Sequence, residues 1–74
     1  MEIVTVILST PLFTSEGSSL PKGIVSILGR LLDSSAGGIS IQATNYQDGK
    51  GRELDGAPTT LFIPMHKVDH VIHG

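Results

Sequence analysis

The amino-acid sequence predicts a small, mainly β domain that spans residues 1–74. The 39% apolar content is rich in Ile, Val and Leu, with nine glycines and no tryptophan, which is typical of a β-rich globular chain rather than a disordered one. Short segments rich in β-branched residues, or alternating between apolar and polar positions, are separated by turn-forming residues. These observations together favour several short strands joined by tight turns.

Size and charge limit what the chain can do alone. A chain this short buries only about 60% of the surface that its unfolded form exposes, so its own core is marginal. The sequence has no cysteine, which excludes disulfides as stabilising cross-links, and we therefore expect oligomerisation. The formal net charge of −2 provides no broad attraction to nucleic acid or to an anionic membrane.

The sequence also predicts a cytoplasmic protein with no membrane partner. No segment reaches the ~18 to 20 consecutive apolar residues that a membrane span requires. The apolar run from Ile3 to Leu8 is not preceded by a base, the first being Lys22, so it does not have the form of a secretory signal.

Four segments have the pattern of β-strands. Glu2 to Ser9 is rich in β-branched side chains, and Ile39 to Tyr46 alternates with period two, as a half-buried strand does. Leu61 to Ile63 and Val68 to Ile72 are short apolar segments, and only a tight turn fits between them. That turn carries Met65 to Lys67.

The segment from Ser19 to Ser35 supports two interpretations. Its apolar residues fall at helical spacing, which would give an α+β domain. Gly23 and Gly29 argue against a helix, since each costs about 1 kcal/mol relative to alanine in a helix interior. A long strand buried on both faces also fits, because a glycine in its middle permits a sharp bend. The apolar residues concerned are Ile24, Val25, Ile27, Leu28, Leu31 and Leu32.

Two turn-rich stretches connect these segments. Thr14 to Pro21 contains consecutive small polar residues and is interpreted as a surface loop. Gln47 to Pro58 contains two turn signals on either side of Glu53-Leu54, which indicates a long hairpin arm before the final pair of strands.

The layout resembles the Sm-like family of small β-barrels. Gly29, Leu31 and Asp33, followed by the Ile39 strand, are similar to the family's first motif, and two apolar strands around a short polar turn are similar to its second. His66 falls on the histidine of the bacterial RNA-chaperone branch. The chain departs from the family pattern where Gly37-Gly38 replace an asparagine and Pro64-Met65 replace an arginine-glycine pair. Small size and these departures suit a member carried by a phage or mobile element.

The resemblance implies a strongly bent, five-stranded antiparallel barrel of the Sm-like or SH3-like kind. Its fourth and fifth strands would pair with neighbouring copies to close a homo-oligomeric ring. The turns after the second and fourth strands would face the pore and hold single-stranded RNA, or DNA. Here these turns are Asp33 to Gly38 and Met65 to Lys67, so the implied binding residues are Ser34, Ser35, Met65, His66 and Lys67.

A second candidate patch lies on the hairpin arm. Tyr46 beside Lys50 and Arg52 is the minimum set for base stacking with phosphate contact. The plainer interpretation of this patch, and of His66 and Lys67, is solvated turn residues.

We expect no metal site, no cofactor and no enzymatic activity. On a strand His66 and His70 would share a face while Asp69 and His73 take the other, which separates the candidate ligands. No nucleophile, base and orienting acid can be assembled from the sequence. The alternative to nucleic-acid binding is a structural or protein-interaction module that uses the same barrel only for assembly.

Overall fold

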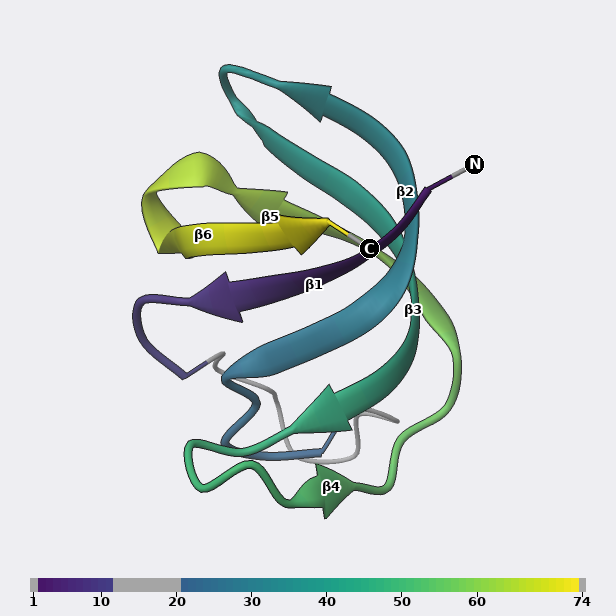
Figure 1. Cartoon of the computed structure of the whole chain (residues 1–74), viewed down its shortest axis with the longest axis vertical. Coiled ribbons are helices and arrows are strands. Elements are labelled where there is room, and N and C mark those ends of the chain that lie inside the picture. Colours follow the sequence, from purple (N-terminus) through teal and green to yellow (C-terminus); the bar gives the residue numbers. More distant parts are fainter. Residues whose placement is uncertain (1, 12–20, 74) are drawn as a thin grey trace.

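The computed structural model describes residues 2–11 and 21–73. Within them the fold is mainly β, with five antiparallel strands in a strongly curled half-barrel sheet (Figure 1). A two-residue strand and one turn of 3-10 helix complete it. The predicted fold class, a small and strongly bent antiparallel β structure, is confirmed. In chain order the elements are β1 (Ile3–Leu8), β2 (Ser26–Ser35), β3 (Gly38–Gln47), β4 (Glu53–Leu54), β5 (Thr59–Pro64), η1 (Met65–Lys67) and β6 (Val68–His73).

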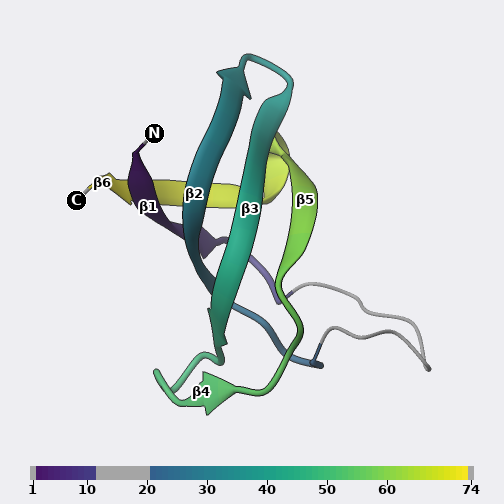
Figure 2. The same cartoon turned by 90° about the vertical axis from the view of Figure 1, so that its right-hand side faces the viewer.

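Strand β3 organises the sheet because it pairs on both sides. β2 lies along one edge of β3, while β5 pairs with its first half and β4 with its last two residues on the other edge. β1 follows beyond β2, and β6 pairs with the far side of β1. Figure 2 shows the long β2–β3 hairpin with β5 beside it. β5 and β6 therefore lie at opposite ends of the strand order, and each pairs on one side only among the described residues.

The segment Ser26–Ser35 is a bent strand, so the helical interpretation of 19–35 is wrong over its described residues. β2 pairs with β1 on one side and β3 on the other, and its register shifts between Leu28 and Gly29. A Cβ added at Gly29 would lie 2.3 Å from the carbonyl oxygen of Gln42. The two backbones come this close because glycine has no side chain, as a sharp bend requires. Positions 19 and 20, and all of the predicted Ser-rich loop except Pro21, lie outside the described residues.

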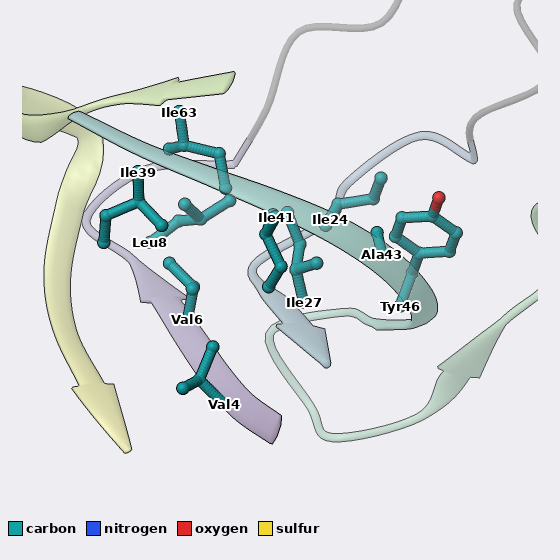
Figure 3. Close-up of a cluster of buried hydrophobic side chains, with 10 residues drawn as sticks. All are labelled: Val4, Val6, Leu8, Ile24, Ile27, Ile39, Ile41, Ala43, Tyr46 and Ile63. Carbon is teal, nitrogen blue, oxygen red and sulfur yellow. The ribbon is translucent and has the colours of Figure 1, made fainter. Parts of the chain in front are cut away.

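The core lies inside the curl of the sheet (Figure 3). Alternate residues of β1 point inward, and the inward residues of β2, β3 and β5 meet them. Burial of these apolar side chains is the main stabilising contribution to folding. The buried residues are Val4, Val6, Leu8, Ile24, Ile27, Ile39, Ile41, Ala43, Tyr46 and Ile63. Among the described residues, no helix is long and apolar enough to cross a membrane.

Candidate functional site

The two turns implied as a binding site lie side by side. The Met65 backbone N–H donates a hydrogen bond of 3.2 Å to the carbonyl oxygen of Gly37. Directly beside it, Pro64 at the end of β5 is opposite Gly38 at the start of β3. η1 is thereby held against the β2–β3 turn. We call Ser34, Ser35, Met65, His66 and Lys67 the turn site.

Ser9, directly after β1, anchors η1 from its other side. The Ser9 backbone N–H donates to the carbonyl oxygen of Lys67 at 2.8 Å. Its hydroxyl lies 3.2 Å from the same oxygen and 3.4 Å from that of His66. The η1 backbone is therefore fixed, while the His66 side chain is exposed and Lys67 is half-buried. Sequence reasoning missed Ser9, whose only signal is a hydroxyl side chain at a strand end.

The two serines of the turn site face opposite sides of the hairpin. Ser34 is opposite Ile39, whose side chain is in the core, whereas Ser35 is opposite Gly38. The Ser35 hydroxyl accepts a hydrogen bond of 3.3 Å from the Gly37 N–H, and its oxygen lies 3.5 Å from the carbonyl oxygen of Gly38. Ser35 thus shapes the turn that carries it. The two hydroxyls cannot act as one adjacent pair of donors.

Phe62 is a candidate that sequence reasoning overlooked. Its side chain is 60% exposed, and a Cβ added at Gly38 would lie 2.5 Å from its Cζ atom. The ring therefore rests against the backbone of β3 next to the turn site. The sequence presents Leu61 to Ile63 as one apolar run. Side chains alternate between the two faces of a strand, so the buried Ile63 places Phe62 on the outward face.

Tyr46 does not belong to a surface patch, and its predicted role in base stacking is wrong. Its side chain is 1% exposed, and its hydroxyl donates to the carbonyl oxygen of Ala57 at 2.8 Å. Strict alternation from Ile41 and Ala43 would point Tyr46 outward, but the register of β3 against β2 shifts between Ala43 and Asn45. This irregularity turns the ring into the core, where it packs at one end of the buried cluster (Figure 3). Of the predicted lateral patch, only Lys50 and Arg52 are on the surface.

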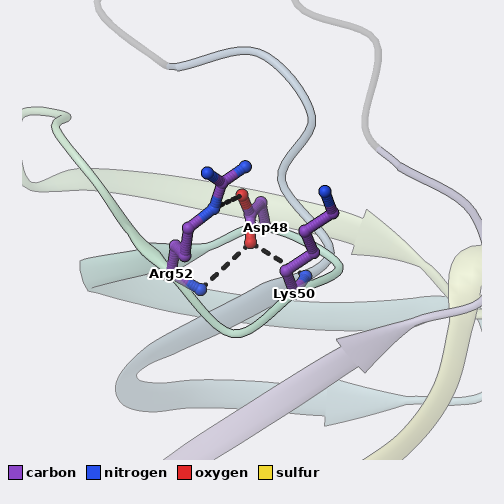
Figure 4. A network of polar contacts seen from close by, with 3 residues as sticks. All are labelled: Asp48, Lys50 and Arg52. Carbon is purple, nitrogen blue, oxygen red and sulfur yellow. Dashed lines mark hydrogen bonds and ion pairs between the residues drawn. The ribbon is translucent and has the colours of Figure 1, made fainter.

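Asp48 organises the loop that carries Lys50 and Arg52. One carboxylate oxygen accepts the backbone N–H groups of Lys50 at 2.9 Å and Arg52 at 3.0 Å, and the other accepts the Nε of Arg52 at 3.0 Å (Figure 4). The Arg52 backbone hydrogen bond is the largest cause that lowers the pKa of Asp48, and the Lys50 N–H and the guanidinium add to it against the opposing effect of desolvation. Arg52 is thus paired with a carboxylate, whereas the Lys50 side chain extends from the loop away from Asp48 (Figure 4).

The histidines of β6 pair with neighbouring carboxylates. His70 Nδ1 lies 2.8 Å from Asp69 Oδ2, and His73 Nδ1 contacts Glu2 Oε2, which joins the end of β6 to the start of β1. All four side chains are about half exposed or more. In residues 2–11 and 21–73, no group of three or more His, Cys, Asp or Glu side chains is arranged to hold a metal ion.

No family model, curated protein or solved structure matches this chain. A functional assignment therefore rests on the residues described above and on their geometry.

Proposed function

We propose that this chain is an Sm-like, ring-forming, non-enzymatic binder of single-stranded nucleic acid in the cytoplasm, with RNA as the expected ligand. The observation that carries the proposal is the hydrogen bond from the Met65 N–H to the Gly37 carbonyl oxygen, which holds η1 beside the β2–β3 turn. Hydroxyl, imidazole and ammonium groups from Ser35, His66 and Lys67 gather at this end of the sheet. Such groups contact the bases and phosphates of single strands.

The two open strand edges support the ring in this proposal. β5 pairs with β3 and β6 pairs with β1, and in the described residues neither has a second partner. An unpaired edge is a template for association, and head-to-tail pairing of β5 with β6 of the next copy removes both edges when the ring closes. Repetition then places one Lys67 per subunit around the axis, a local positive ring on a chain of net charge −2.

Fluorescence anisotropy with a labelled single-stranded RNA oligomer tests this proposal. We expect binding that weakens steeply with added salt, because phosphate contacts release counterions. Lys67→Ala should weaken binding at least about tenfold, since every subunit loses one such contact. Lys22→Ala is the matched control, because Lys22 is an exposed lysine that precedes β2 and lies outside the turn site. Equal loss in both variants, or no binding at low salt, would contradict the proposal.

A second candidate, the structural or protein-interaction module, is favoured by an exposed apolar patch. Ile3, Leu28 and Ile72 are 45%, 38% and 52% exposed. The strand registers place all three around Thr5 on the outward face of β1, β2 and β6. Exposed apolar patches commonly mark protein interaction sites. A closed oligomer that binds no oligonucleotide at low salt supports this candidate over the first.

A further inference from the structure

The outward face of β2, β3 and β5 carries an aromatic ring and a cation that the turn site does not include. Directly opposed residues of an antiparallel pair point to the same side of the sheet. The two registers along β3 therefore place two cross-strand rows on this face: Asp33, Ser40 and Phe62, and then Arg30, Gln42 and Thr60. Apart from half-buried Ser40, all of these residues are exposed.

Phe62 provides a flat apolar surface in this face. Among the described residues it is the one exposed side chain of the Phe, Tyr and Trp class, since Tyr46 is buried. Its ring is supported by the backbone at Gly38, where even a methyl group would collide with it. A ring held in this way loses little further freedom when a planar group stacks on it, and nucleobases stack on aromatic side chains with little regard to their sequence.

Arg30 provides an unpaired cation in the neighbouring row. Within the described part of the chain it makes no ion pair and no side-chain hydrogen bond, in contrast to Arg52. β2 and β5 are separated by two strand spacings of ~4.8 Å, and the two rows by two residues of ~3.3 Å along β3, so the backbones at Arg30 and Phe62 lie about 12 Å apart. One nucleotide together with an extended arginine side chain can bridge this separation.

We propose that this face, the sheet-face site, binds a nucleotide of single-stranded nucleic acid, with the base stacked on Phe62 and the phosphate at Arg30. The proposal rests on the proposed function and adds a second contact surface to the turn site. Asp33 sets the orientation of the bound nucleotide. It lies in the same row as Phe62, and its carboxylate repels a phosphate, so the phosphate lies in the neighbouring row with Arg30. Ser40 and Gln42, between the ring and the cation, supply hydrogen-bonding groups for a base edge or a ribose hydroxyl.

Two oligonucleotides of equal length, one intact and one abasic, separate stacking from phosphate contact. Anisotropy titrations at several salt concentrations use the wild-type chain, Phe62→Leu, Phe62→Tyr and Arg30→Gln, with circular dichroism to confirm folding. Phe62→Leu should weaken binding of the intact oligomer about 5- to 100-fold and leave the abasic one unchanged, because only base stacking is lost. Phe62→Tyr should restore it. Arg30→Gln should weaken binding of both oligomers and make the salt dependence shallower.

The other outcomes separate this inference from the function on which it rests. If Phe62→Leu and Arg30→Gln bind as the wild type does while Lys67→Ala does not, the sheet-face site is overturned and the turn site stands. If Phe62→Leu lowers the solution mass of the protein, Phe62 is a contact between copies and the inference is also overturned. A wild-type chain that binds neither oligomer at low salt overturns both proposals.

Discussion

Replacing Gly29 with alanine tests whether the bend of β2 depends on close backbone approach. The added Cβ would lie 2.3 Å from the carbonyl oxygen of Gln42 and 2.9 Å from the Cα of Ala43. The first distance is about 1 Å short of ordinary contact, and both neighbouring atoms are backbone, so β3 must move away from β2. Overpacking of this kind costs roughly 1–3 kcal/mol or more, and each weakened ladder hydrogen bond adds about 1 kcal/mol. We expect the free energy of unfolding to fall by at least about 3 kcal/mol.

Urea unfolding followed by far-ultraviolet circular dichroism measures this loss. With a slope of about 1 kcal/mol per molar urea for a chain of this size, the midpoint of Gly29→Ala should fall by about 3 M, or the variant should be unfolded without urea. Gly49→Ala is the control, because its nearest neighbour would be a Val25 methyl at 3.8 Å, and its midpoint should change little. Both variants are compared at one protein concentration. Equal midpoints for Gly29→Ala and the wild type would refute the account of the bend.

Two further predictions concern the far end of the sheet. Tyr46→Phe removes the hydrogen bond to the Ala57 carbonyl oxygen and should lower the free energy of unfolding by about 1 kcal/mol in a urea titration; an unchanged midpoint would contradict the anchoring role of this hydroxyl. Because the folded loop lowers the pKa of Asp48, its stabilising contribution is present above the ordinary carboxyl pKa and is lost as the pH falls through the lowered value. Thermal unfolding between pH 2 and 6 should therefore depend less on pH in Asp48→Asn than in the wild type, whereas identical profiles would argue against this assignment.

Much of the strand layout was predictable because local pattern and tertiary structure agree. The β-branched run from Glu2 to Ser9 contains the observed Ile3–Leu8, and the alternation from Ile39 to Tyr46 lies within the observed Gly38–Gln47. The segment that became β2 could not be assigned from periodicity. Ile27 and Leu31 point into the core, whereas Leu28 and Leu32 are exposed, so the expectation of a strand buried on both faces is wrong. Apolar residues at both odd and even positions of one strand fall at helical spacing as well. The close contact at Gly29 that decides between the two is a long-range feature.

The site was less predictable than the fold. The alternation from Ile39 to Ala43 predicts an outward Tyr46, whereas the register shift between Ala43 and Asn45 breaks that alternation and turns the ring inward. Phe62 is on an outward position of an edge strand between two apolar residues, so composition concealed its exposure. Ser9 acts through backbone atoms of η1, which lie 57 and 58 positions later in the chain. No local sequence pattern encodes a contact over that separation.

The solution mass, measured by light scattering with size-exclusion chromatography, tests the proposed ring most directly. With the open edges of β5 and β6, the proposed Sm-like ring predicts a closed multiple of the 7.8 kDa chain, with about five or more copies. A monomer or a simple dimer would contradict the ring, and with it the repeated turn site on which the proposed binding of RNA depends.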